Sequence, residues 1–419
     1  APKRNKQYQY SNDKIFSIRF NPNYRETLQK YPSLFPSTPS EQAPDVIAYV
    51  DPKFKMPQVW RSNLNVDIQL PYDFMLSVGA MYTRDIYNVA QINMNEAEPT
   101  GVYNEQPDRI YWASKKYEYN DYTNGKNVVV KLSNGEDKGY QYSFNAILTK
   151  KYDFGFTGSI GYTYTMAKDL TANPGSAPNS AWQNNVAVNS LNDPGVSYSL
   201  FSTPHRIIAN ASYEINYAKC LKTTFSLFYS GYHTGRYSYT YYNDMNGDGN
   251  YSDLIYVPNS QDEMTFVDIT DKSGAITYSA VDQAKDFWDF VNNDSYLKDR
   301  KGKYVERNGS LTPWINRFDF KIAQDFYATL GGRKYGIQVS LDMLNVGNMI
   351  NSKWGAYQSC GLKSYDNVQL LKTASKVGEP LTYQINANSR EAFKERSSWQ
   401  YTNTIGSAWS MQLGVKVTF

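Results

Sequence analysis

The last eleven residues of the chain alternate between apolar side chains and small or polar ones. The apolar positions are Trp409, Met411, Leu413, Val415, Val417 and Phe419. Because successive side chains of a β-strand point to opposite faces, this pattern predicts a strand with one apolar face. Taken alone, the segment fits either the last strand of a soluble β-sandwich or the last strand of a membrane barrel.

The same alternation recurs along the chain. It is present in residues 60–70, 74–82, 142–148, 154–165, 207–215, 223–229, 317–326 and 335–343. Arg, Asp, Lys, Asn, Gln and Ser recur on the opposite face of these strands. The segments are long, whereas strands of soluble sandwiches usually have about five or six residues. An apolar outside and a polar inside over such lengths predict an all-β protein, a transmembrane antiparallel β-barrel.

The connections between these segments alternate between short and long. The short ones lie near residues 71–73, 151–153, 217–221 and 330–333, and the long ones at 91–138, 170–204, 241–315 and 351–406. In bacterial barrels the short turns face the periplasm and the long loops face the outside of the cell. A soluble sandwich has no reason to sort its loops in this way. The pattern therefore predicts a bacterial outer-membrane protein with extracellular loops and a periplasmic C-terminus.

The strand count predicts that further strands complete the barrel. About nine spanning strands fall within residues 57–419, and the first runs from the cell surface to the periplasm. Residues 1–56 would then form an extracellular loop region. Complete single-chain barrels have an even number of strands and both termini in the periplasm. We therefore expect residues 57–419 to be the C-terminal part of a larger barrel.

The composition fits this architecture. Aromatic residues make up 16% of the 419 residues, with 38 Tyr, and membrane barrels carry aromatic girdles at both interfaces. Tyr-rich soluble β-proteins share this profile. The net charge of +3, with both signs interspersed, gives no support for nucleic-acid binding. The strand pattern places Cys220 and Cys360 at opposite ends of the barrel, too far apart for a disulfide.

Five segments resemble one family of outer-membrane receptors. They are residues 51–71, 203–215, 246–258, 296–326 (with the elements G-x-Y-x-E-R-N and N-R-F-D) and 342–351. Their order and spacing resemble the Oar-like, carboxypeptidase regulatory-like domain branch of the TonB-dependent receptors of Bacteroidota. Residues 409–419 also resemble the terminal signal by which the barrel assembly machinery recognises outer-membrane barrels.

The resemblance implies a barrel of about 22 strands whose lumen holds an N-terminal plug. It also implies a TonB complex that energises the transporter through an N-terminal box. Plug, box and regulatory-like domain have no counterpart in residues 1–419. The implied partners are therefore the N-terminal half of the same barrel with its plug, the TonB complex and outer-membrane lipid.

One loop segment contains a candidate calcium site. Its oxygen-bearing side chains are Asp244, Asn246, Asp248, Asn250 and Asp253. The spacing resembles the start of an EF-hand loop, with Gly249 at the sharp turn. An EF-hand has an acidic ligand at its twelfth position, where this chain has Ile255. The alternative is an extracellular turn rich in Asn, Asp and Gly. No other cofactor is expected.

Residues 279–293 predict a short amphipathic helix in the longest loop. Ser279 and Asp282 resemble a capping box at its start. The apolar residues expected on one face are Val281, Ala284, Trp288 and Val291. The helix could cover a ligand or dock a surface lipoprotein or another outer-membrane protein. The alternative is that it packs against its own loops.

Charged positions on the polar faces of the strands are expected in the lumen. They are Arg61, Asp67, Arg317, Asp319, Lys321 and Asp325. They could contact a substrate or a plug, or they could form salt bridges with one another. The only histidines are His205 and His233, and the pattern pairs neither with a carboxylate or a serine. We therefore expect no enzymatic activity.

Two functions remain in view. The first is a TonB-dependent transporter that imports a bulky solute, either a peptide, a glycan or a metal chelate. The second is a non-transporting scaffold or adhesion barrel that binds partner surface proteins through its loops. A passive porin is a third hypothesis, for which fewer and smaller loops would be expected.

Overall fold

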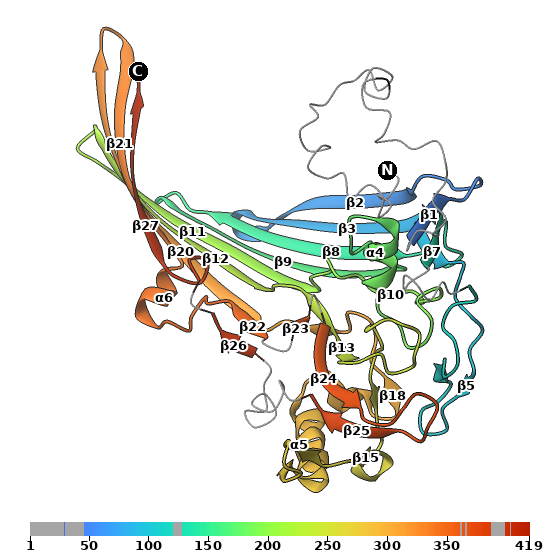
Figure 1. Cartoon of the computed structure of the whole chain (residues 1–419). Helices are drawn as coiled ribbons and strands as arrows, with labels where there is room; N and C mark the ends of the chain where they lie inside the picture. The colour runs from blue at the N-terminus through green and yellow to red at the C-terminus, as the bar shows by residue number, and fades with distance from the viewer. Residues whose placement is uncertain are drawn as a thin grey trace.

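A computed structural model describes residue 29 and residues 46–119, 128–360, 363–364, 367–386, 399–402 and 404–419. This part of the chain has two regions (Figure 1). One is a long, twisted and curved antiparallel sheet, here called the wall. The other, here called the lobe, is built from the connections between wall strands and lies at one end of the wall.

The wall is a meander in which each long strand pairs with the next along the chain. Its path is β2 (Gln58–Leu70), β3 (Phe74–Tyr87), β8 (Tyr140–Lys151), β9 (Phe156–Asp169), β11 (His205–Tyr217), β12 (Leu221–His233), β20 (Trp314–Leu330), β21 (Arg333–Leu344) and β27 (Ser410–Thr418). A short strand, β10 (Ser197–Tyr198), pairs with the end of β9. The prediction of an all-β fold is confirmed, although the last strand excludes Trp409 and Phe419 at its two ends.

The register keeps apolar side chains in continuous rows across the wall. One row runs through Ile68, Leu76, Leu148, Ile160 and Ala209. A slip of one residue in any pairing would move a whole apolar set to the other face, so the alternation fixes the register. The apolar rows are not packed into a two-layer core, because Leu413 is 72% exposed and Leu227 is 41% exposed.

Tight turns connect pairs of wall strands at the end away from the lobe (Figure 1). Between β2 and β3 the turn is the 3-10 helix η2 (Pro71–Asp73), in which Tyr72 and Asp73 have φ near +60°. Gly331 and Gly332 form the turn between β20 and β21, with φ of 59° and 78°. A glycine pair adopts these left-handed angles without the steric cost of a Cβ atom.

The lobe has its own mixed sheet and its own hydrophobic core. The sheet contains β13 (Arg236–Tyr241), β15 (Thr265–Phe266), β19 (Ser310–Leu311), β23 (Lys363–Ser364), β24 (Asn367–Thr373) and β25 (Thr382–Ile385). The helix α5 (Ala280–Asn293) packs against this sheet through Phe287, Phe290 and Val291. Buried side chains from all four long connections between wall strands meet in one cluster, for example Tyr103, Val186, Tyr241 and Leu370.

Smaller elements complete the loop end of the molecule. A three-stranded sheet contains β1 (Val46–Val50), β4 (Ala90–Asn93) and β7 (Val128–Ser133), and the short helix α4 (Pro178–Gln183) packs on it. The others are β5 (Gly101–Val102), β6 (Ile110–Tyr111), β14 (Tyr256–Val257), β16 (Ile269–Thr270), β17 (Ile276–Tyr278), β18 (Lys303–Tyr304), β22 (Gln358–Cys360), β26 (Trp399–Tyr401), η3 (Gln261–Glu263), η4 (Leu297–Arg300) and α6 (Val346–Ile350).

The predicted helix is present, and its predicted apolar face is confirmed except at Val281, because Val291 is buried and Ala284 and Trp288 pack against the core of the lobe. Ser279 caps α5 by accepting a hydrogen bond from the amide of Asp282 at 3.1 Å, while the Asp282 carboxylate accepts from the Ser279 hydroxyl and not from its amide. The buried residues are Gln283, Phe287, Phe290 and Val291, whereas Val281 is 75% exposed. The buried Gln283 donates to the carbonyls of Val267 and Tyr278 and accepts from the amide of Ile385.

Candidate functional site

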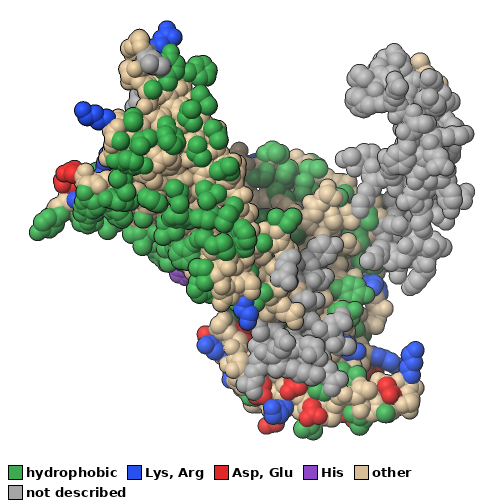
Figure 2. Space-filling model, turned by 90° about the vertical axis from the view of Figure 1, so that its left-hand side faces the viewer, with side chains coloured by type: hydrophobic (Ala, Val, Ile, Leu, Met, Phe, Trp, Pro, Cys, Tyr) green, Lys and Arg blue, Asp and Glu red, His purple; other side chains and the backbone are tan. Residues whose placement is uncertain are grey.

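The outer face of the wall exposes a wide apolar surface. Figure 2 shows hydrophobic side chains gathered over the wall, while charged side chains gather on the lobe. The exposed residues include Leu64, Val66, Phe144, Ile160, Leu227, Phe318, Ile337, Leu413 and Val415. Soluble monomers rarely expose contiguous apolar patches of more than a few hundred Å². A face of this extent is suited to contact with lipid hydrocarbon.

Polar groups on the outer face occur at its two borders, where they satisfy one another. Near the tight turns, the hydroxyls of Tyr217 and Thr223 both donate to Oε1 of Gln324, at 2.9 and 2.6 Å. Gln324 lies on the outer face of β20 between Ile322 and Phe326. It interrupts the run of apolar side chains on this face, so this cluster marks the turn-side edge of the apolar band.

The second border lies at the loop end. The hydroxyl of Tyr229 and Nε1 of Trp314 donate to Oδ1 of Asn316, at 2.7 and 2.9 Å. Tyr and Trp are enriched at membrane interfaces, where an apolar ring and a polar tip meet lipid and water together. Between the two borders, β20 presents only Phe318, Phe320 and Ile322 on this face.

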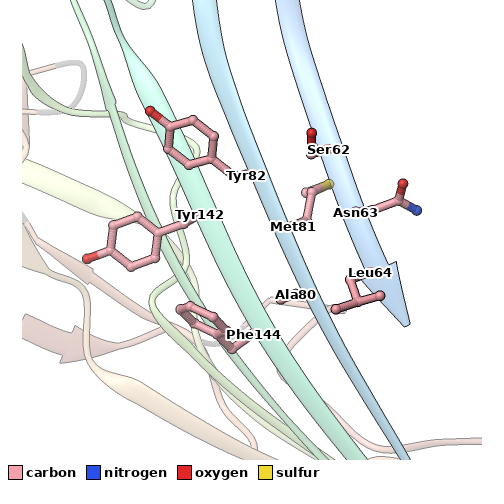
Figure 3. Close-up of a pocket in the computed structure, with 8 residues that line it drawn as sticks. All are labelled: Ser62, Asn63, Leu64, Ala80, Met81, Tyr82, Tyr142 and Phe144. Atoms are coloured by element: carbon pink, nitrogen blue, oxygen red, sulfur yellow. The ribbon is translucent and has the colours of Figure 1, made fainter. Parts of the chain in front are cut away.

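The outer face also has a shallow apolar depression over β2, β3 and β8 (Figure 3). Its volume is about 520 Å³. The small Ala80 lies between Leu64 and Phe144, and Ser62 lies beside Tyr82. Its lining is mostly apolar and has no charged side chain, so it suits a hydrocarbon chain and has no groups for catalysis.

The opposite face of the wall is polar, and its charges pair with neighbours. Lys321 contacts Asp342 at 2.8 Å, and Lys222 lies between Glu214 at 3.3 Å and Asp325 at 3.7 Å. These contacts join adjacent strands and hold the wall together. The predicted charged residues therefore lie where expected, and those named here serve the wall itself.

The other predicted charged positions are also satisfied by nearby groups. Arg61 donates to the Thr83 hydroxyl at 3.1 Å, and Asp67 accepts from the Ser77 hydroxyl at 2.5 Å. Asp319 accepts from the amide of Asn345 at 2.7 Å, which fixes the chain where β21 ends. Arg317 reaches the Tyr357 hydroxyl and the Gly406 carbonyl, both at 3.4 Å.

The candidate calcium segment forms a loop closed by its own backbone amides. The Asp244 carboxylate accepts from the amides of Gly247 at 2.8 Å and Gly249 at 2.9 Å, and both glycines have positive φ. In the same way Asn246 accepts from the amide of Asp248, at 3.0 Å, and Asp248 accepts from the amide of Asn250, at 2.7 Å. This arrangement leaves further carboxylate lone pairs for a cation.

Burial perturbs the three carboxyls of this loop. Burial raises the pKa of Asp253 to about 7, while Arg109 lowers it and Asp244 raises it further. Burial also raises the pKa of Asp248 well above its usual range, and the charges of Asp253 and Asp244 add to the shift. The pKa of Asp244 is raised for the same first reason, its burial. Burial therefore favours the neutral form of each carboxyl, and a bound cation would favour the charged form.

Arg109 supplies the opposite charge. Its fully buried guanidinium lies 3.5 Å from Asp253 and donates to the carbonyls of Val188 and Leu254. The guanidinium carbon is 4.8 Å from the ring centroid of Tyr304, a cation–π contact. Within the described residues no group of three or more His, Cys, Asp or Glu side chains is placed to hold a metal ion. Calcium at Asp244–Asp253 stays a prediction.

The comparison with known families decides the class of the wall. A family model described as "Outer membrane beta barrel domain" matches residues 2–354. The chain belongs to the outer membrane β-barrel domain family. Neither a curated protein nor a solved structure matched the chain. Membership places this barrel domain in the bacterial outer membrane. Among the described residues, no helix is long and apolar enough to cross a bilayer.

The polar face of the barrel domain contains an apolar patch that the sequence pattern did not predict. Ile147 and Ile208 lie in one row on either side of Gly161, where a Cβ atom would be 3.2 and 3.3 Å from their Cγ1 atoms. Phe228 lies in the next row, beside Asn210 and Asp319, and a cavity of about 350 Å³ is lined by Phe228, Leu344 and Lys321 among others. We call Ile147, Ile208, Phe228 and Leu344 the lumenal patch; more than a third of each side chain is exposed.

Each histidine of the barrel domain forms a hydrogen bond with a neighbouring group. His205 Nδ1 shares a hydrogen bond of 2.7 Å with the Tyr162 hydroxyl, and His233 Nδ1 donates to the Thr312 carbonyl at 2.6 Å. Both rings lie at the loop-side border of the wall, where His233 packs edge-on against Trp314 at 5.0 Å. Cys220 is exposed in a tight turn, and Cys360 is buried in the lobe.

Proposed function

We propose that this barrel domain is part of a TonB-dependent transporter that imports a bulky solute, such as a peptide, a glycan or a metal chelate. The proposal assigns the wall to the membrane, the lobe to the cell surface and the tight turns and C-terminus to the periplasm. It includes a plug in the lumen and energy supplied by a TonB complex. It assigns no catalytic reaction to the chain.

The lumenal patch is the observation that carries the proposal. Barrel interiors that conduct solutes passively are polar and filled with water. Ile147, Ile208, Phe228 and Leu344 would each keep more than a third of their side chain in that water. Burying apolar area is worth about 25 cal/mol per Å², so the patch favours a lumen packed by polypeptide. A plug domain is a polypeptide of this kind.

The lobe supports the same function, because it offers a preformed surface for a large ligand. Gln106, from the first long connection, donates to the hydroxyls of Tyr241 and Tyr383, both at 2.9 Å. Arg109, also from the first connection, binds the carbonyls of Val188 and Leu254 in the second and third. These buried contacts join four connections into one body, so little ordering entropy would be lost when a solute binds.

The two edges of the wall support a larger barrel. In the described chain β2 pairs only with β3, and β27 pairs only with β21. Unpaired backbone amides and carbonyls each cost several kcal/mol in lipid (roughly, by transfer energies), so both edges need partner strands in a membrane. Phe419, 94% exposed, is also accessible to the barrel assembly machinery, which fits the proposed role of residues 409–419 as an assembly signal.

A scaffold that binds partner surface proteins is the second candidate. Ile276 on β17 and Val281 on α5 are exposed on neighbouring parts of the lobe, at 59% and 75%. Apolar residues that are exposed together on a lobe surface suit a lipoprotein or another outer-membrane protein as partner. This candidate needs neither energy nor passage through the lumen.

Uptake measurements in the source bacterium separate these functions. Cells with and without the gene would be supplied with labelled mixtures of peptides, glycans and ferric chelates, with and without a protonophore. Gene-dependent uptake that the protonophore abolishes would support the proposal. Gene-dependent surface binding without uptake would support the scaffold, and uptake that resists the protonophore would support a passive pore.

A second experiment tests the lumenal patch in the complete protein. Ile208→Asp with Phe228→Asp should unseat the plug and raise the sensitivity of cells to a large hydrophilic antibiotic such as vancomycin. Ser212→Asp, on the same face and next to the cavity, is the matched control and should leave sensitivity unchanged. Equal sensitivity of both strains would contradict a plug packed on this patch.

A further inference from the structure

The segment that follows β21 presents apolar side chains outside both the wall and the lobe core. It contains the short helix α6 and continues to Trp354. Ile350 is 73% exposed and Trp354 is 53% exposed, and Met349 is also exposed. We call residues 346–354 the knuckle. Its exposed apolar residues belong to neither of the two buried clusters of the described chain.

The knuckle continues the outer face of the wall. Pairing of β20 with β21 stops at Phe320 and Met343, so Phe318 lies beyond the last paired residue of β21. A Cβ atom on Gly347 would lie 3.6 Å from Trp354 Cε3 and 3.9 Å from Phe318 Cδ2. Phe318 packs against Tyr229 on the outer face, with ring centroids 4.9 Å apart. The knuckle therefore adjoins the lipid-facing surface where β21 has ended.

Its level in the membrane follows from the loop-side border. Phe318 is two residues from Asn316, the acceptor of the hydrogen bonds from Tyr229 and Trp314. The knuckle therefore contacts the wall at Phe318, two residues from this border on the side of the apolar band. Elements at such a level meet both the headgroups and the first part of the acyl chains.

The knuckle is held in place by hydrogen bonds from the side chains of two asparagines, one buried and one partly exposed. Asn345 is buried with φ of 52°, and its Nδ2 donates to the carbonyls of Gly355 at 3.2 Å and Ser407 at 2.8 Å. Asn348 Nδ2 donates to the carbonyls of Ser352 and Trp354, at 2.7 and 3.1 Å. A segment fixed in this way keeps its apolar side chains exposed in a defined direction.

Its chemistry suits an anionic lipid surface. Between Ile350 and Trp354 lie Asn351, Ser352 and Lys353, and Lys353 is exposed with Nζ 5.8 Å from the ring centroid of Tyr401. Trp at the interface, an aliphatic pair beside it and a Lys that reaches headgroup phosphates form the pattern of interfacial anchors.

We propose that residues 346–354 form an interfacial anchor that inserts into the leaflet on the loop side of the wall. Ile350 and Trp354 enter the acyl region, and Lys353 binds the phosphate of a lipid headgroup. The inference rests on membership in the outer membrane β-barrel domain family and is independent of the proposed transport.

The test measures contact with lipid at a single site. In the full protein, Cys220→Ser and Cys360→Ala remove the native thiols, and Ile350→Cys carries an environment-sensitive fluorophore. The purified protein is reconstituted in vesicles of phosphatidylcholine and phosphatidylglycerol, with or without brominated acyl chains. The label should emit at shorter wavelength and be quenched at least twofold by the brominated lipids. Val281→Cys on α5 is the matched exposed control and should show neither effect.

Two results would overturn the proposal. One is quenching of the Ile350→Cys label by aqueous iodide as strong as that of the control. The other is the absence of quenching by brominated lipid; a blue shift in that case would mean contact with protein. Heat-dependent mobility on gels confirms that each variant is folded. A further variant, Lys353→Glu, should reduce lipid quenching in anionic vesicles and leave it unchanged in pure phosphatidylcholine; an equal change in both would remove Lys353 from the anchor.

Discussion

Replacing Leu227 by arginine tests the membrane assignment of the wall at its centre. Leu227 pairs with Phe320, which lies four residues from Gln324 at one border of the apolar band and four from Asn316 at the other. Four residues of a strand span about 13 Å, and a tilt of about 45° reduces this to about 9 Å along the membrane normal. Leu227 is therefore close to the midplane of the bilayer.

The cost of Leu227→Arg follows from this depth. Arginine on the lipid face of a barrel is unfavourable by about 2–4 kcal/mol at the midplane and by about 0–1 kcal/mol near the interfaces. At about 1.4 kcal/mol per tenfold change, the folding equilibrium should shift by a factor of roughly 30 to 700. Ser212→Arg is the matched control, because Ser212 lies on the polar face of the neighbouring strand. It should cost less than about 1 kcal/mol, since lumenal positions face water.

The assay is reversible urea unfolding of the complete protein in phosphatidylcholine vesicles, followed by tryptophan fluorescence. The midpoint should fall for Leu227→Arg and change little for Ser212→Arg. Equal destabilisation of both variants would contradict a lipid-facing position for Leu227, and a larger loss for Ser212→Arg would mean that the faces of the wall are assigned the wrong way round. Equal m-values would show that the comparison concerns stability and not a change in the unfolded state.

Three further predictions concern the lobe. Arg109→Met should destabilise it by about 3–5 kcal/mol, because it leaves Asp253 buried without its partner, and Asp253→Asn should restore part of the loss in thermal unfolding. Because the folded-state pKa of Asp253 is about 7, above the ordinary carboxyl value, the metal-free lobe should lose stability as pH rises from roughly 4 to 7. In calorimetry, calcium should reverse this loss of stability, and Asp248→Asn should abolish the reversal. If calcium has no effect on stability, the proposed calcium site is ruled out. Gln283→Ala should cost about 1–3 kcal/mol, against less than about 0.5 kcal/mol for the exposed Val281→Ala, as measured by chemical denaturation.

The wall could be predicted from the sequence because its strands and turns are determined by residues that are close together in the chain. Alternating side chains report which face is apolar, and the left-handed Gly331 and Gly332 mark a turn by composition alone. The terminal strand follows the same rule. The lumenal patch is the exception, since Ile208 and Phe228 are apolar at positions of the polar parity, and only this break in the alternation could have revealed them.

The lobe could not be predicted, because its contacts join residues far apart in the chain. All six residues of β13 are buried, so this strand has no alternation to read. It pairs in parallel with β24, more than a hundred residues later, through contacts such as Tyr239 with Val368. The position of α5 and most of its apolar face could be predicted from the cap and the spacing, but the burial of Gln283 depends on partners on β25 and beside β15.

The shared core of the four long connections constrains how this protein can change. A barrel with independent loops can exchange one of them and acquire a new specificity. Here Tyr103, Val186, Tyr241 and Leu370 come from different connections and fill the same interior, so a change of length or volume in one of them is transmitted to the other three. New ligand preferences would have to arise by single substitutions of exposed residues on the surface of the lobe.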